Sequence, residues 1–353
     1  MNGILEATNI DKFIALTPLM RLGNNRKRRD EMMVYFRHIV LKMLHDEGIL
    51  STFEKPISIE DAAKKSGWEY PSDYVDMFVS ILANDKVLKR SAGVMGNEYS
   101  LSSGFKLAEK DPVVHHFEDF DVTYAEYVKN IPARLKGVSQ EFTGTISLFN
   151  WDSALASQLY QAVRDSAFAF IDKKWLRNAK LLDAGCGPGY ETADMWVKLA
   201  GMNAEITAIE PDEGLIKIAE ADFTRNVKKA GLDIDPNAKD VKLPTFHQGT
   251  VEKLEFDDNT FDAVYFSNIL HWTPDPPSAI KEIVRVIKPG GMLFGAQSGT
   301  ETTNPYMNLV TRTIKNTYGF FSRQDFTKWM IAAGIKFFKT ATIVNTFKGF
   351  KRG

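Results

Sequence analysis

Apolar residues recur at helical spacing in the first hundred positions and at strand spacing later in the chain. Over residues 33–45 and 72–83 they fall three or four positions apart, which predicts two amphipathic helices with a shorter helix between them. Residues 87–90 and 98–101 are β-prone runs on either side of a turn, and they predict a two-stranded hairpin. From residue 179 onward, short apolar runs alternate with helical patterns. Such alternation predicts a parallel sheet in an α/β domain.

Helices followed by a hairpin are typical of a winged-helix domain, which we place at residues 1–104. Asp73, Asp76 and Asp85 lie on or beside the helix that would read DNA, and that helix has no Lys or Arg. Contacts to phosphate supply most of the affinity for DNA, and acidic side chains oppose them. We therefore expect this domain to form a homodimer or a lid, and we expect no nucleic-acid partner.

Residues 105–175 have a helical pattern and many aromatic side chains. We expect them to form a helical linker or a layer over the substrate, and residues 176–353 to form the α/β domain. The aromatic residues are Phe117, Phe120, Tyr124, Tyr127, Phe142, Phe149, Trp151 and Tyr160. Their number favours an apolar or aromatic substrate, although a domain core or a dimer interface would also use them.

A glycine-rich turn follows the first strand of the α/β domain. The apolar strand over residues 180–184 runs into the turn GCGPG (185–189), and a helix begins directly after it. Glycines permit positive φ angles and let a ligand approach the backbone closely. Glu210 ends the next strand, where a carboxylate can accept hydrogen bonds from both hydroxyls of a ribose. Because dinucleotide enzymes share such a turn, the surrounding motifs must decide the ligand.

Four motifs occur in the order found in one enzyme family. They are LLDAGCGPGYET, AIEPDEGLIKIAE, EFDDNTFDAVYFSNILHW and EIVRVIKPGGMLF, within residues 180–297. In these motifs the chain resembles the class I S-adenosylmethionine-dependent methyltransferases. The resemblance implies an α/β fold with a Rossmann-like sheet of seven strands, here preceded by the mainly α winged-helix domain. The last two strands are then expected at residues 336–344 and within residues 345–353.

The upstream outline is similar to that of two-domain methyltransferases of small molecules, such as the plant-type O-methyltransferases. This similarity implies a homodimer formed through the N-terminal domain and a small-molecule acceptor. Oxygen is the favoured acceptor atom, with carbon, nitrogen and sulfur open. S-adenosylmethionine would be the cofactor and S-adenosylhomocysteine the product. Two other functions stay open: a protein that uses this cofactor in a non-methylating reaction, and a winged-helix regulator that senses it.

The family's cofactor contacts carry over to matching positions of this sequence. The residues expected to hold the cofactor are Asp183, Gly185, Cys186, Gly187 and Gly189 around the methionine part, Glu210 on the ribose, Pro211, Thr250 and Val251 near the adenine, and Ser267 and Asn268 beneath the sulfonium. Thr250 stands where the family usually has an acid, so a backbone group or Glu252 would have to contact the adenine amino group. We expect Cys186 to pack as a small side chain, because the sequence offers it no activating partner.

His271 is the candidate catalytic residue, because it follows the fourth strand on the ligand side of the sheet. A phenol-like acceptor benefits from a base that titrates near neutrality, and the plant-type enzymes use a His in this loop. Trp272 follows His271 directly, which resembles the methyltransferases of quinone biosynthesis, where the pair lines the site or is structural. Both roles stay open. The candidate substrate contacts are Tyr160, Trp272, Tyr318 and Phe320.

The amino-acid composition excludes several other classes of protein. Lys and Arg number 44 and Asp and Glu 45, and the net charge of −1 argues against a coat for nucleic acid or an anionic membrane. The single cysteine excludes an internal disulfide and a multi-thiolate metal site, and we expect no metal. No apolar run approaches the roughly 18 residues of a membrane span, and the N-terminus does not read as a signal peptide. We therefore expect a cytoplasmic protein.

Overall fold

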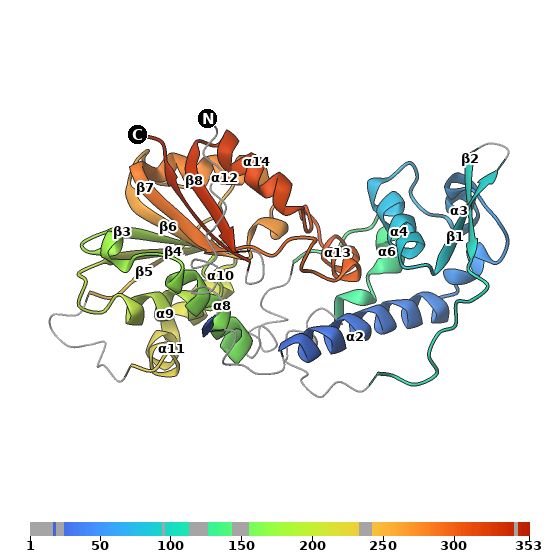
Figure 1. Cartoon of the computed structure of the whole chain (residues 1–353), viewed down its shortest axis with the longest axis horizontal. Helices are drawn as coiled ribbons and strands as arrows, with labels where there is room; N and C mark the ends of the chain where they lie inside the picture. The colour runs from blue at the N-terminus through green and yellow to red at the C-terminus, as the bar shows by residue number, and fades with distance from the viewer. Residues whose placement is uncertain are drawn as a thin grey trace. The chain divides into compact units, whose positions relative to one another are not determined.

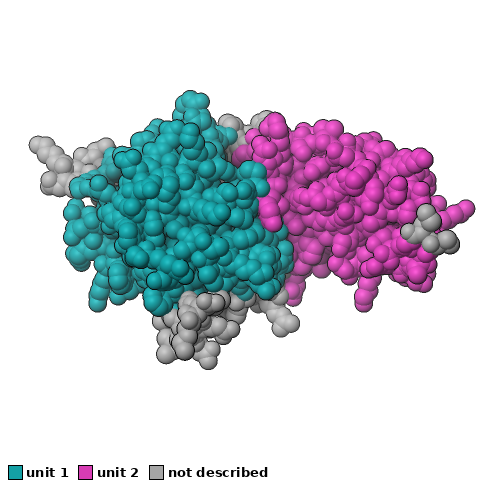
Figure 2. Space-filling view, turned by 90° about the horizontal axis from the view of Figure 1, so that it is seen from above, with its two compact units in different colours: residues 1–25, 143–302, 320–353 teal, residues 26–142, 303–319 magenta. Residues whose placement is uncertain are grey.

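Contacts divide the chain into two units. The structure is a computed structural model that describes residues 17–18, 25–93, 96–112, 126–142, 155–232, 242–341 and 345–353. Unit 1 comprises residues 1–25, 143–302 and 320–353, and unit 2 comprises residues 26–142 and 303–319 (Figure 2). The unit boundaries differ from the domain boundaries expected after residues 104 and 175, which stay a prediction.

Unit 2 contains the three helices and the hairpin predicted for the N-terminal part, together with two short helical segments that were not predicted there. In chain order they are α2 Asn25–Asp46, η1 Leu50–Phe53, α3 Ile59–Ser66, α4 Asp73–Asn84, β1 Leu88–Gly93, β2 Gly96–Leu101 and α6 Ile131–Leu135 (Figure 1). The start of α3 is fixed by Ser58, whose side chain accepts a hydrogen bond from the Asp61 backbone N–H. It ends at Gly67, where φ is 67°. The order of elements is as predicted, while the winged-helix assignment and its role in a dimer stay predictions.

A segment from late in the sequence completes unit 2. It carries α13 Pro305–Thr311. The buried Tyr74 hydroxyl on α4 donates to the Leu309 carbonyl oxygen over 3.1 Å, and the Tyr306 hydroxyl donates to Asp85 Oδ2 over 2.6 Å. These partners are 235 and 221 positions apart in the sequence. The sequence pattern assigned this helix to the α/β domain, because a helix after a strand is the ordinary continuation of such a domain.

The expected helical layer over residues 105–175 is partly described. Its helices are α6, α8 Gln158–Ala169 and η2 Lys173–Leu176. Residues 105–112 form turns and irregular backbone, so the helical prediction is wrong there. Pro112 disfavours helical backbone at Asp111, and the Asp111 carboxylate instead accepts hydrogen bonds from His38 and Lys42 on α2. Five of the aromatic residues named for this layer lie outside the described residues: Phe117, Phe120, Tyr124, Phe149 and Trp151.

Seven strands form the sheet of unit 1. They are β3 Lys180–Ala184, β4 Glu205–Glu210, β5 Thr245–Gln248, β6 Phe261–Ser267, β7 Ile287–Ala296, β8 Ile335–Ala341 and β9 Thr346–Lys351. Their order is β5-β4-β3-β6-β7-β9-β8, with β9 antiparallel to both neighbours and the strands from β5 to β7 parallel. The predicted seven-stranded Rossmann-like α/β fold is confirmed, including a last strand within residues 345–353.

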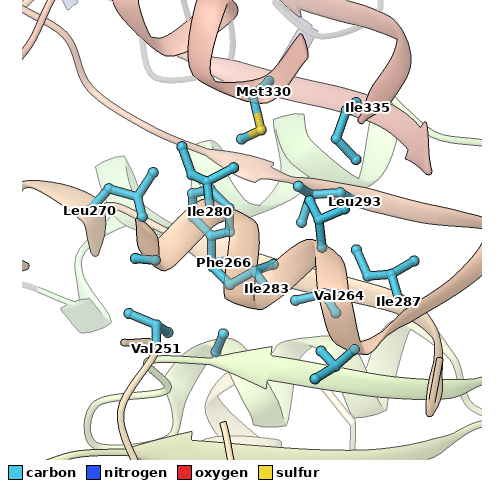
Figure 3. Close-up of a cluster of buried hydrophobic side chains, with 14 of the residues drawn as sticks. Val251, Val264, Phe266, Leu270, Ile280, Ile283, Ile287, Leu293, Met330 and Ile335 are labelled. Carbon is cyan, nitrogen blue, oxygen red and sulfur yellow. The ribbon is translucent and has the colours of Figure 1, made fainter. Parts of the chain in front are cut away.

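Helices cover both faces of the sheet (Figure 1), and alternate residues of the central strands pack against different faces. Leu182 and Phe266 pack with α12 Pro276–Val286 and α14 Arg323–Ala332 in a cluster that Figure 3 shows. Leu181 and Tyr265, one position before each, pack against α8 and α9 Tyr190–Lys198. Successive side chains of a strand point to opposite faces, so strands buried on both faces must be apolar throughout. Helices thus cover both faces of the sheet, and the loops that follow the strands lie at its carboxyl edge.

Candidate functional site

The glycine turn between β3 and α9 brings backbone N–H groups to the carboxyl edge of the sheet. Gly185, Gly187 and Gly189 have φ angles of 79°, 52° and 85°, a region that other residues rarely adopt. A Cβ on Gly185 would lie 2.5 Å from Ile269 Cγ2, which also excludes a side chain there. The Gly187 N–H donates to Glu210 Oε2 over 3.2 Å. The turn is thus shaped for close approach, as predicted from the glycine spacing.

Glu210 ends β4 directly beside this turn. Its other carboxylate oxygen, Oε1, accepts a hydrogen bond from the Asp212 N–H over 3.2 Å. Only 8% of the residue is exposed, and this burial raises the pKa of Glu210 to about 7. A carboxylate in this position can accept hydrogen bonds from ribose hydroxyls, as the sequence predicts.

Asp183 lies in the neighbouring strand and is fully buried. The Thr192 hydroxyl on α9 donates to Asp183 Oδ2 over 2.6 Å. Burial raises the pKa of Asp183 to about 8, and the nearby Glu191 and Glu210 carboxyls act in the same direction. Thr192 and Glu191 were not singled out from the sequence; the only signal was their place in the first turn of a helix that follows a glycine turn.

Cys186 is buried at the centre of the turn. Its thiol packs in a cluster with Ala208 and Ile216, and Sγ lies 3.6 Å from the Gly187 carbonyl oxygen. Burial raises the pKa of the Cys186 thiol well above its usual value. A thiol of this kind is a poor nucleophile at neutral pH, which favours the packing role.

The residues expected near adenine follow the ends of β4 and β5. The Pro211 carbonyl oxygen accepts a hydrogen bond from Gln248 Nε2 over 3.0 Å. Val251 is buried in the sheet core, whereas Thr250 lies in a turn that it closes with Lys253. Glu252, the expected substitute for the missing acid, is half-buried, and this burial raises its pKa. The structure thus brings an apolar side chain and an acid to this edge, while the adenine contact itself stays a prediction.

Ser267 and Asn268 join the ends of β6 and β7. Asn268 has a φ of 53°, and its N–H donates to the Ala296 carbonyl oxygen over 2.8 Å. Its side-chain Oδ1 accepts a hydrogen bond from the Ser298 N–H over 2.8 Å. The pair therefore shapes the loop edge, and its expected place beneath the sulfonium stays a prediction.

His271 is buried in the short helix η3 Leu270–Trp272. Its ring stacks on Phe320 with 4.4 Å between centroids, and Trp272 lies at 4.9 Å. Burial lowers the pKa of His271 to about 3, so the ring is neutral at physiological pH. Its Nδ1 lies 3.3 Å from Nε2 of Gln297, a residue that the sequence reasoning missed.

Two of the four candidate substrate residues lie next to His271. Trp272 and Phe320 contact His271. Tyr160 lies half-buried on α8, and Tyr318 belongs to unit 2 with 43% of its surface exposed. The rings of Trp272 and Phe320 thus meet at His271, and a substrate contact by any of the four residues stays a prediction.

Two features are absent from the described part of the chain. Within the described ranges, no group of three or more His, Cys, Asp or Glu is placed to hold a metal ion. Over the same ranges, no helix has both the length and the apolar character that crossing a membrane requires.

Comparison with known proteins identifies the sheet and its glycine turn. Residues 182–295 match the family described as methyltransferase domain. Demethylmenaquinone methyltransferase of Bacillus subtilis (strain 168) is 30% identical over 177 residues, which cover 49% of this chain and 65% of the relative. The chain carries a class I S-adenosylmethionine-dependent methyltransferase domain. The family's cofactor, S-adenosylmethionine, fits the residues present, because the buried carboxyls of Asp183 and Glu210 lie beside a glycine turn whose backbone has positive φ angles.

Another relative of this methyltransferase domain is named for a reaction other than methyl transfer. The mouse protein named arginine-hydroxylase NDUFAF5, mitochondrial, is 30% identical over 151 residues, 42% of this chain and 34% of the relative. The chain therefore spans between a third and two thirds of the length of these curated relatives.

Two solved structures share the fold over the whole chain. The DszA carbon methyltransferase is 14% identical with a TM-score of 0.68, and the match covers 100% of this chain and 99% of that one. The CMeT domain of the citrinin polyketide synthase is 12% identical with a TM-score of 0.66, and the match covers 100% of both chains. At this identity the likeness shows the fold alone.

Proposed function

We propose that the chain is an S-adenosylmethionine-dependent methyltransferase that acts on a small organic acceptor. The observation that carries this proposal is the contact between the Gly187 N–H and the Glu210 carboxylate. It sets the glycine turn and an acceptor of hydroxyl hydrogen bonds side by side, at the carboxyl ends of β3 and β4. Ligands bind at this edge of open α/β sheets. Asp183, buried next to them with a pKa of about 8, would ionise on binding of a cationic ligand, because a nearby positive charge favours the charged carboxylate.

The chain's own residues hold and orient the reactants. When bound, S-adenosylmethionine supplies a methyl group on a positively charged sulfur, open to in-line attack. Glu210 would accept hydrogen bonds from the ribose, and the backbone of residues 185–189 would surround the methionine part. Holding two reactants in line can lower a barrier by roughly 7–11 kcal/mol. Positioning is therefore sufficient to account for most of the catalysis that we propose.

The acceptor in this proposal is apolar or aromatic. His271, Phe320 and Trp272 form a group of neighbouring rings, and an aromatic or other flat acceptor could stack against such a group. Oxygen is the acceptor atom that the sequence favours. Carbon is a second candidate, because the low pKa of His271 makes it a weak base toward a hydroxyl.

Calorimetric binding of S-adenosylmethionine and S-adenosylhomocysteine tests the cofactor site. Hydrogen bonds to a charged group contribute roughly 1.5–3 kcal/mol each, so Glu210→Ala should weaken binding at least about tenfold. Glu210→Gln keeps the shape and loses the charge, and it should give an intermediate loss. Glu213→Ala is the matched control, because Glu213 is exposed on α10 Glu213–Ala221 and paired with Lys217. Equal affinity of the Glu210 and Glu213 variants would contradict the proposed site.

A non-methylating reaction is the principal alternative, because one relative is named a hydroxylase. Incubation with methyl-labelled cofactor and a metabolite mixture separates the two functions. A methyltransferase passes the label to an acceptor and releases an equal amount of S-adenosylhomocysteine. Tight cofactor binding without any labelled product across oxygen, carbon, nitrogen and sulfur acceptors would favour the alternative.

A further inference from the structure

The side-chain amide of Gln297 has a fixed orientation. Gln297 follows β7 and is 95% buried. Its Oε1 accepts a hydrogen bond from the Leu270 backbone N–H over 3.2 Å, and its Nε2 donates to the Ser298 carbonyl oxygen over 3.0 Å. A backbone N–H can only donate and a carbonyl oxygen can only accept. Two backbone groups from different loops therefore determine which end of the amide is oxygen and which is nitrogen.

This orientation determines the tautomer of His271. The second hydrogen of Gln297 Nε2 points to His271 Nδ1, 3.3 Å away. Because Nε2 of an amide is only a donor, Nδ1 must be the acceptor. A neutral imidazole carries one proton, so that proton must be on Nε2 of His271. Among the described residues, the structure gives Nε2 of His271 no hydrogen-bond partner.

We propose that Gln297 is a positioning residue that holds neutral His271 with its proton on Nε2, so that His271 acts as a hydrogen-bond donor to an oxygen of the acceptor and not as a base. The N–H would stabilise the negative charge that this oxygen gains when the acceptor loses a proton to water. The neighbouring nucleophilic atom then forms a bond to the methyl group as the methyl–sulfur bond breaks, and S-adenosylhomocysteine leaves. This role rests on the proposed methyltransferase function. It also agrees with the full burial of the ring, which opposes a charged imidazolium.

The tautomer can be measured without cofactor or acceptor. The chain has six histidines, so selective ¹⁵N labelling of histidine gives a simple spectrum of the intact protein. The signals of residue 271 are assigned by their loss in His271→Gln or, if that variant does not fold, by variants of the other five histidines. We expect a protonated Nε2 and a bare Nδ1, unchanged from pH 6 to pH 8. A protonated Nδ1, or a ring that becomes charged in this range, would overturn the proposal.

Gln297→Glu is the matched test of the positioning role. A carboxylate at this position can only accept a hydrogen bond, so the proton should move to Nδ1 of His271 or the ring should gain a second proton. The spectrum should change at residue 271, while the other histidine signals stay in place. An unchanged tautomer in a folded Gln297→Glu protein would show that Gln297 does not position the ring.

Methyl-transfer activity of a His271 variant then shows whether His271 acts as a hydrogen-bond donor or only packs against its neighbours. His271→Phe keeps a ring that can stack on Phe320 but removes the N–H. Loss of one such donor lowers kcat about 10²–10³-fold with little effect on KM. Full activity of His271→Phe would reduce His271 to a structural residue. Failure of the proposed function would look different, because the wild-type protein would then show the Nε2–H tautomer but no methyl transfer.

Discussion

Buried carboxyls in the glycine turn make the site costly to fold in the absence of a ligand. In the folded protein the pKa of Asp183 is about 8, against 3.8 for a solvated carboxyl, because burial disfavours the charged form. Between these pH values the unfolded chain has lost this proton and the folded chain has kept it. The contribution to the free energy of unfolding is therefore full below about pH 4 and is lost progressively as the pH rises toward 8.

Asp183→Asn should consequently stabilise the ligand-free protein, and more so as the pH increases. Each unit of displacement of this pKa corresponds to roughly 1.4 kcal/mol, so the gain over wild type at pH 8 should exceed that at pH 5 by at least about 1 kcal/mol. Urea unfolding at the two pH values measures the difference. Glu220→Gln removes an exposed carboxyl from α10 and reports the general effect of losing one negative charge.

The same variant should bind S-adenosylmethionine more weakly, because a bound cation favours the ionised form of Asp183 and an asparagine cannot ionise. In Asp183→Asn the free energy of unfolding then increases while the affinity for S-adenosylmethionine decreases. Such opposite changes are expected of a functional group that destabilises the folded protein. If Asp183→Asn lost stability equally at pH 5 and pH 8, the carboxyl would be structural and its burial would have no bearing on the ligand.

At the scale of elements, a buried charge cluster joins α8 to α9. Arg164 on α8 lies 3.7 Å from carboxylate oxygens of Glu191 and Asp194 on α9, and all three side chains are buried. Its guanidinium also donates to the Leu155 carbonyl oxygen over 2.9 Å. This cluster anchors the helix that begins at the glycine turn, and so it fixes the turn itself.

Arg164→Met should therefore destabilise the protein by about 3–5 kcal/mol, because it leaves the buried Glu191 carboxylate without its cationic partner, while Asp194 keeps Lys198. The loss should be smaller at pH 5 than at pH 8, since burial raises the pKa of Glu191 and removal of Arg164 raises it further. Urea unfolding at both pH values measures it. Lys217→Met breaks an exposed pair on α10 and should cost far less. Equal losses for the two variants would mean that the cluster is solvated.

Single elements were predictable from the sequence because their signals are local. The strand over residues 205–210 is an apolar run that ends in an acid, and the cap and stop of α3 are Ser58 and Gly67. Gln297 and Thr192 were missed for the opposite reason. Each acts through a hydrogen bond to a residue on another element, and the register of the sheet decides which side chains meet there.

At the scale of the whole molecule, no sequence pattern indicates that α13 belongs to unit 2. Asn304 caps this helix and Pro305 opens it, a start that suits any helix of an α/β domain. Its partners on α4 precede it by more than two hundred positions, and no periodicity connects segments at that distance. The sheet was predictable because its strands share one pattern, whereas the discontinuous unit depends on tertiary contacts alone.

Leu309→Ala should therefore loosen a part of the molecule that is remote from it in sequence. Leu309 is fully buried, and its carbonyl oxygen binds Tyr74 on α4. Truncation of a buried leucine costs about 2–5 kcal/mol, so hydrogen exchange should accelerate in α4 and α13 while β3 and β6 keep their protection. Leu293→Ala, equally buried in β7, should accelerate exchange in unit 1 instead. If Leu309→Ala accelerated hydrogen exchange only within residues 303–319, α13 would pack on unit 2 without being part of its core.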